Sequence, residues 1–201
     1  MIRSMLRRIL VLCFAWICGS VCGFAPTPSR SHADERGVAE AEIPLGLNLG
    51  LRVPISGMQT LKGESVGRNT CLAGKYSRYS VASVYARSID EPGLPELLSH
   101  LESLIGENPG QAAYLLLLDK NPRNLAAAAV MEQKLPRTLK RMEIAVSNGQ
   151  SERFAIPRES AVVVIFSDRR LVKHRIDFRS VELNDSVRNQ LSEEWSKVTA
   201  K

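Results

Sequence analysis

Residues 80–118 carry the pattern from which the fold is predicted, and they read SVASVYARSIDEPGLPELLSHLESLIGENPGQAAYLLLL. Ser80–Ala86 is typical of a strand because it carries Val81, Val84 and Tyr85. Leucine and isoleucine then recur at helical spacing over residues 94–105, which predicts an amphipathic helix. Ala113–Leu118 is a continuous apolar run that suits a strand buried on both faces. This order predicts an α/β fold in which a helix joins two parallel strands.

Five further elements are predicted toward the C-terminus. They are a helix over residues 125–134, a short strand over 142–146, two hairpin strands over 161–166 and 171–178, and a helix over 185–198. Asp185 is the expected N-cap of the last helix, because its carboxylate can accept a backbone N–H of the first turn. We therefore expect a central mixed sheet with flanking helices and a C-terminal helix.

The region upstream of residue 80 has no regular pattern. Residues 34–60 are expected to form an extended or loosely ordered N-terminal segment that precedes a folded domain over residues 61–201. Four glycines punctuate residues 56–79, which predicts loops and turns there.

The N-terminus has the features of an export signal. Three arginines, Arg3, Arg7 and Arg8, precede the apolar run Ile9–Val21. This run of about 13 residues is short of the roughly 20 that a membrane-spanning helix needs. Residues 1–33 are therefore predicted to be a signal peptide, cleaved after residue 23 or residue 33. The domain is expected in the periplasm or outside the cell, and a retained N-terminal membrane anchor is the alternative.

Most of the net charge belongs to this predicted signal. The whole chain carries a formal charge of +6, whereas residues 34–201 contain 23 basic and 21 acidic side chains. A domain near neutrality gives no reason to expect nucleic acid as a partner. The basic group Arg169, Arg170, Lys173 and Arg175 is interpreted as a solvated turn. No membrane contact is expected beyond the signal segment.

Only one cysteine belongs to the predicted domain. Cys13, Cys18 and Cys22 lie in the predicted signal, and Cys71 lies ahead of the first core strand. Cys71 has three possible roles. It can be a half-buried apolar side chain. It can form a disulfide with a partner or a second copy. It can also be a reactive thiol whose thiolate the basic residues Arg68, Lys75 and Arg78 favour.

Other chemical motifs are not evident in the sequence. The three histidines have no Cys or His at metal-ligand spacing, so no metal site is expected. Neither a phosphate-binding loop nor a dinucleotide fingerprint occurs, and we expect no cofactor.

The order of elements resembles the thioredoxin-like fold, in particular its exported redoxin members. In those proteins an extra short strand precedes the final hairpin, and a C-terminal helix packs back on the sheet. The likeness covers roughly residues 60–198. Within it, residues 67–76, GRNTCLAGKY, are similar to the cysteine-motif segment of a group of exported bacterial thioredoxin-like proteins. Residues 80–87 resemble the strand that follows this motif. The resemblance implies a three-layer α/β fold and thiol chemistry.

The chain departs from this family at three positions. The motif reads Cys71-Leu-Ala-Gly74 in place of Cys-x-x-Cys, so a resolving thiol is missing. The reactive cysteine of thioredoxins and peroxiredoxins follows the first strand and opens the helix, but here residues 88–93 contain no cysteine. The family's cis-proline position falls on Ser160 or Ala161, several residues after Pro157.

These departures favour a degenerate, non-catalytic redoxin that acts as a binding or accessory module in the cell envelope. We expect it to hold an envelope protein through the Cys71 loop, and an intermolecular disulfide at Cys71 is one way to do so. The alternative is a single-cysteine thiol-disulfide oxidoreductase or peroxidase that uses Cys71 and an external thiol. A structural envelope protein with an inert Cys71 is the third hypothesis. Cys71 is accordingly the candidate catalytic residue.

Overall fold

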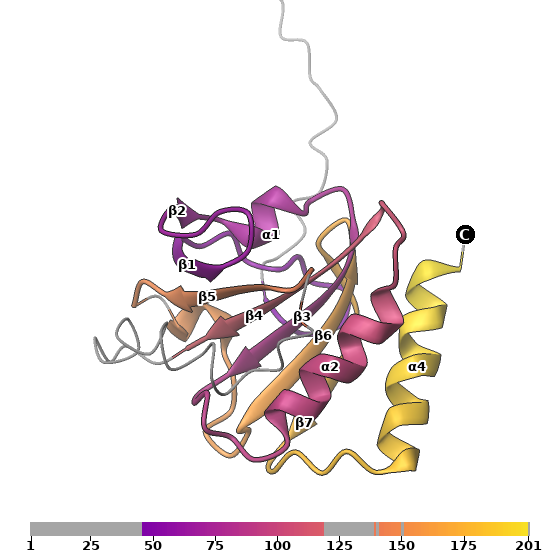
Figure 1. Cartoon of the computed structure of the whole chain (residues 1–201). Helices are drawn as coiled ribbons and strands as arrows, with labels where there is room; N and C mark the ends of the chain where they lie inside the picture. Colours follow the sequence, from indigo (N-terminus) through magenta and orange to yellow (C-terminus); the bar gives the residue numbers. More distant parts are fainter. Residues whose placement is uncertain (1–45, 119–138, 140, 150, 201) are drawn as a thin grey trace, which may run out of the picture. The chain divides into compact units, whose positions relative to one another are not determined.

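This computed structural model describes residues 46–118, 139, 141–149 and 151–200. They contain a seven-stranded mixed sheet with the strand order β2-β1-β5-β4-β3-β6-β7 (Figure 1). Its strands are Met58–Lys62 (β1), Asn69–Thr70 (β2), Ser80–Ala86 (β3), Gln111–Leu117 (β4), Glu143–Ser147 (β5), Val162–Asp168 (β6) and Leu171–Phe178 (β7). The helices are Leu72–Lys75 (α1), Leu94–Ile105 (α2) and Asp185–Thr199 (α4), with a 3-10 turn at Ser151–Phe154 (η1). The predicted α/β class with a C-terminal helix is confirmed.

Strand directions follow the sequence prediction. β3 pairs in parallel with β4, and β4 pairs in parallel with β5. β6 runs antiparallel to β3 and to β7, which forms the predicted hairpin. All seven residues of β3 are buried, because β3 lies in the interior of the sheet and is covered on both faces.

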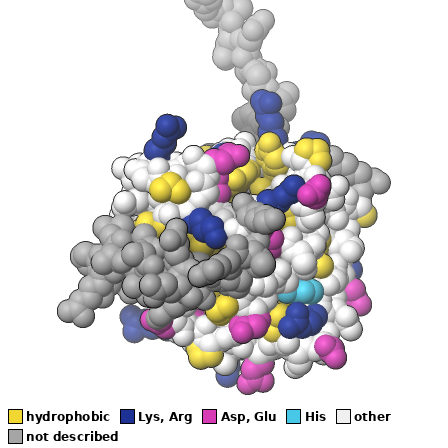
Figure 2. Space-filling model, in the orientation of Figure 1, with side chains coloured by type: hydrophobic (Ala, Val, Ile, Leu, Met, Phe, Trp, Pro, Cys, Tyr) yellow, Lys and Arg dark blue, Asp and Glu magenta, His cyan; other side chains and the backbone are white. Residues whose placement is uncertain are grey.

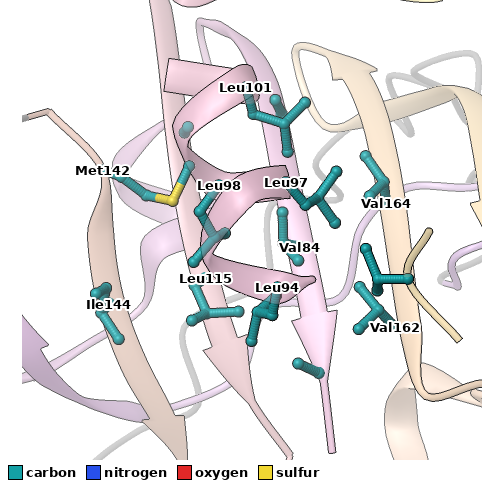
Figure 3. Close-up of a cluster of buried hydrophobic side chains, with 14 of the residues drawn as sticks. Val84, Leu94, Leu97, Leu98, Leu101, Leu115, Met142, Ile144, Val162 and Val164 are labelled. Atoms are coloured by element: carbon teal, nitrogen blue, oxygen red, sulfur yellow. The ribbon is translucent and has the colours of Figure 1, made fainter. Parts of the chain in front are cut away.

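One face of the sheet is covered by α2 and α4. The leucines of α2 pack on residues of β3, β4 and β6, and Figure 3 labels Leu97, Val84 and Val164 among the buried side chains. The indole N–H of Trp195 on α4 donates to the carbonyl oxygen of Leu104 at 3.1 Å, which ties the two helices together. This face contains the larger of the two apolar clusters.

The opposite face of the sheet supports α1 and the turn η1. Leu72, Tyr85, Tyr114 and Phe154 are almost fully buried there. Residues upstream of β1 join the same cluster, since Leu47 and Val53 are each 2% exposed. The segment expected to be loosely ordered thus contributes to the core. The predicted helix over 125–134 and the predicted signal over 1–33 lie outside the described residues.

Two local predictions were wrong. Residues 56–79, predicted as loops and turns, contain β1, β2 and α1, because β1 gains its hydrogen bonds from the distant strand β5. The N-cap of α4 is Asn184 and not Asp185, since the side-chain oxygen of Asn184 accepts the N–H of Val187 at 3.0 Å.

Candidate functional site around Cys71

Cys71 is the N-cap of α1 and is half-buried. Its Sγ accepts the backbone N–H of Gly74 at 3.2 Å, so the sulfur closes the single turn of this helix. A Cβ on Gly74 would lie 3.3 Å from the sulfur, which is a tight contact. Gly74 occupies the place of the absent resolving thiol, and its backbone is bonded to the sulfur. Among the described residues, Cys71 is the one cysteine, and it is free.

A layer of tyrosines lies around and beneath Cys71. Tyr76 and Tyr79 pack with Cys71 on the buried cluster, and the rings of Tyr76 and Tyr114 stack at 6.5 Å between centroids. The hydroxyls of Tyr85 and Tyr114 are 3.1 Å apart. Burial raises the pKa of both of these phenols, and the nearby Cys71 sulfur adds to the increase. The thiol therefore lies near two tyrosines that stay neutral at physiological pH.

Lys75 was predicted from the sequence to favour the thiolate of Cys71, but in the structure it binds two carboxylates. Its Nζ donates to Oε2 of Glu64 at 3.0 Å and to Oε1 of Glu143. Glu143 is only 3% exposed. Burial lowers the pKa of Lys75, but the hydrogen bonds to Glu143 and Glu64 outweigh it, so the pKa is raised. Because two carboxylates neutralise the ammonium group, Lys75 is poorly suited to stabilise a thiolate at Cys71.

The other two cations proposed for Cys71 are on the surface. The side chains of Arg68 and Arg78 are exposed. Among the described residues, neither guanidinium makes a hydrogen bond to the Cys71 sulfur, which is bonded to Gly74. The structure thus packs Cys71 with tyrosines, while its sulfur is hydrogen-bonded to the backbone of Gly74 and not to any of the three cations.

The junction of β3 with α2 contains a feature that sequence reasoning missed. Arg87 follows β3, and its guanidinium donates to three backbone carbonyls of one loop. The acceptors are the oxygens of Ile156 at 3.1 Å, Pro157 at 2.8 Å and Ser160 at 3.2 Å. The sequence signal that could have indicated this contact is an arginine placed directly after a buried strand. This junction is where the thioredoxin pattern expects its cysteine.

Glycine fixes the entry into α2 after this junction. Gly93, the N-cap of α2, has a φ of 75°. A Cβ there would lie 2.3 Å from the carbonyl oxygen of Val181. No cis peptide bond occurs among the described residues, so the bond before Pro157 is trans.

The described residues contain no group of three or more His, Cys, Asp or Glu side chains able to hold a metal ion. Across the same ranges, no helix combines the length and the apolar character needed to cross a membrane.

Comparison with known proteins gives likeness in structure alone. No protein-family model and no curated protein sequence matches this chain. A Chlorobium tepidum protein described as a thiol:disulfide interchange protein DsbE aligns with a TM-score of 0.56 and 12% identity, over 76% of this chain and 98% of that one. The thioredoxin domain of a Bacteroides vulgatus thiol-disulfide oxidoreductase aligns with a TM-score of 0.53 and 13% identity, over 73% and 97%. The chain has a thioredoxin-like fold.

The predicted resemblance is therefore confirmed at the level of architecture. The two neighbours are named for thiol-disulfide chemistry. The structural alignments support the shared fold, and at 12% and 13% identity they do not extend that chemistry to this chain. The role of Cys71 has to be argued from its own surroundings.

Proposed function

We propose that this protein is a non-catalytic thioredoxin-fold module that is exported and binds another protein in the cell envelope. The junction between β3 and α2 carries this proposal. A redoxin places its attacking thiol there, whereas here residues 87–93 have no cysteine and Arg87 fastens the junction to the loop at 156–160. Without a thiol at the helix N-terminus, the fold lacks the group whose pKa that terminus lowers in active enzymes.

The surroundings of Cys71 support the same proposal. Its sulfur accepts a hydrogen bond from Gly74, and Lys75 is occupied by Glu143 and Glu64. No second cysteine is available within the domain to resolve a mixed disulfide. In this proposal, Cys71 and the neighbouring Tyr76 and Tyr79 form the surface that holds the partner.

A single-cysteine oxidoreductase or peroxidase is the second candidate. Cys71 favours it because the thiol is half-buried and not sealed in the core. Such an enzyme would attack its substrate through Cys71 and release it with an external thiol, since the chain supplies no resolving cysteine.

The reactivity of Cys71 separates the two candidates. Native protein is treated with iodoacetamide over a range of pH, and alkylation of the Cys71 peptide is followed by mass spectrometry. The same protein is tested for insulin reduction and peroxide consumption with glutathione as external thiol, with Cys71→Ser as the control. The proposal expects no turnover above that control. Turnover that Cys71→Ser abolishes would establish the enzyme.

Binding is tested separately from catalysis. Envelope extracts of cells with wild-type protein or Cys71→Ser are compared on non-reducing gels, with Ser77→Ala as a matched surface variant of the same segment. A covalent partner gives a band that Cys71→Ser alone removes. A Cys71 thiol that reacts only after unfolding argues against both the enzyme and the covalent complex.

A further inference from the structure

The turn between β6 and β7 gathers basic side chains from three distant segments. The backbone N–H of Arg169 donates to the carbonyl oxygen of Tyr79 at 3.1 Å, which places Arg78 beside the turn. Arg52 pairs with Leu171 in an isolated bridge. The exposed basic residues of this region are Arg52, Arg78, Arg169 and Lys173, and we call them the basic end of the sheet.

The charges of the basic end are not neutralised locally. Among the described residues, none of its four side chains forms an ion pair or a hydrogen bond with a carboxylate. A neighbouring carboxylate, Asp168, accepts a hydrogen bond from the hydroxyl of Ser80 at 3.2 Å. Arg170 has a structural role instead, since its guanidinium donates to the carbonyl oxygen of Val53 at 2.8 and 3.2 Å. Among the described residues, the basic end therefore carries four exposed cations beside the single carboxylate of Asp168, and positive charge is in excess.

Exposed aliphatic side chains lie beside these charges. Backbone hydrogen bonds tie the loop at residues 46–56 to β7 and to the turn before it. The N–H of Gly50 donates to the carbonyl oxygen of Val172, and the N–H of Val53 donates to that of Arg170. This loop carries Leu49, which is 65% exposed, and Ile55, which is 48% exposed. Figure 2 shows hydrophobic, basic and acidic side chains together along its upper edge, where Figure 1 places α1. The loop thus combines apolar and cationic groups on one surface.

In contrast to the sequence-based expectation of no membrane contact beyond the signal segment, we propose that the basic end and the loop at 46–56 dock on an anionic phospholipid surface. Lipid phosphates complement the four cations, and the boundary between headgroups and acyl chains accepts Leu49 and Ile55. A purely acidic polymer would use the cations but would leave the two aliphatic side chains in water.

Hydrogen–deuterium exchange on the full chain tests this proposal, because the readout is local and does not depend on whether residues 1–33 also bind lipid. Exchange is compared on phosphatidylglycerol vesicles and on phosphatidylcholine vesicles. We expect residues 46–56 and 168–173 to be protected on the anionic vesicles only, and the protection to weaken in 0.5 M salt because screening reduces attraction between exposed charges.

Matched variants assign the effect to this face. Arg52→Glu with Arg169→Glu should weaken docking by roughly two orders of magnitude. Arg158→Glu with Arg179→Glu makes the same charge change at the opposite end of the β6–β7 hairpin and should leave docking unchanged. Leu49→Ser with Ile55→Ser should weaken docking without any change of charge. Circular dichroism verifies that each variant is folded.

Three results would overturn the proposal. Equal exchange on the two kinds of vesicle would mean that the anionic surface is not recognised. Equal loss of docking in the two double arginine variants would mean that binding depends on the net charge of the protein and not on this face. The third result has two parts. Soluble polyglutamate protects residues 46–56 and 168–173 in the wild type and in Leu49→Ser with Ile55→Ser, and vesicles protect neither segment. That result would identify an acidic protein as the partner.

Discussion

A single buried carboxylate organises the surroundings of Cys71. Glu143 starts β5, is 3% exposed, and binds the ammonium group of Lys75. Gly63 makes room for it, since a Cβ at that position would lie 2.4 Å from Cγ of Glu143. Lys75 and Glu143 are 68 positions apart in the sequence. Sequence proximity therefore suggested that Lys75 acts on Cys71, whereas in the fold its ammonium group binds Glu143.

The same carboxylate affects Tyr76. Burial, followed by the negative charge of Glu143, raises the pKa of Tyr76 from 10.0 to about 12. The folded state therefore holds the phenol proton more tightly than the unfolded state, and this contribution to stability is lost as the pH rises from 10 to 12. We predict that, between pH 10 and 12, the free energy of unfolding of Tyr76→Phe falls by about 2 kcal/mol less than that of the wild type.

Urea unfolding at pH 8, 10, 11 and 12 measures the difference. The other buried tyrosines are present in both proteins, so the difference between wild type and Tyr76→Phe isolates Tyr76. A constant difference across this range would mean that Tyr76 has an ordinary pKa in the folded protein.

At the scale of elements, α4 shows how a helix boundary depends on backbone geometry. Asn184 and Asp185 are both good capping residues. Asn184 has extended backbone angles and its side chain accepts the N–H of Val187, whereas Asp185 already belongs to the first turn. The neighbouring residues are chemically similar, so composition could not separate them.

Substitution of each residue distinguishes these roles. Asn184→Ala should lower the free energy of unfolding by about 1 kcal/mol, because the cap hydrogen bond from the N–H of Val187 is lost. Asp185→Ala should cost less, about 0.3–1 kcal/mol, because it removes only the favourable charge at the helix N-terminus. Chemical denaturation of both variants gives the comparison, and a larger cost at Asp185 would contradict the observed cap.

The strand β1 shows why the segment upstream of β3 was misread. β1 gains its order from pairing with β5 and β2, and its own sequence MQTLK has no alternating pattern. Strand preference reflects the packing that a strand finds more than its own residues. Local sequence could not supply that information.

At the scale of the whole molecule, two apolar clusters share one sheet. Leu115 and Leu116 are consecutive residues of β4, both fully buried, and they belong to opposite clusters. The continuous apolar run of residues 113–118 predicted this double burial.

Leu115→Ala and Leu116→Ala should each cost about 2–5 kcal/mol of unfolding free energy, because each creates a cavity in a packed face. Since both faces depend on the same strand, we expect one cooperative transition in each variant. Far-ultraviolet circular dichroism and Trp195 fluorescence should report the same midpoint. Separate midpoints would mean that the two clusters unfold independently.

The sequence by itself determined the α/β class, the parallel pair β3 and β4, the helix α2 and the β6–β7 hairpin. The hydrophobic periodicity within each of these segments is a local property, because it does not depend on which other segment of the chain packs against it. It also determined that a resolving thiol is missing after Cys71. Only the tertiary structure decided which groups meet: Lys75 with Glu143, Arg87 with the loop at 156–160, and Arg52 and Arg78 with the β6–β7 turn. Those contacts depend on strand pairing and loop closure between residues far apart in the chain, for which no local pattern carries a signal.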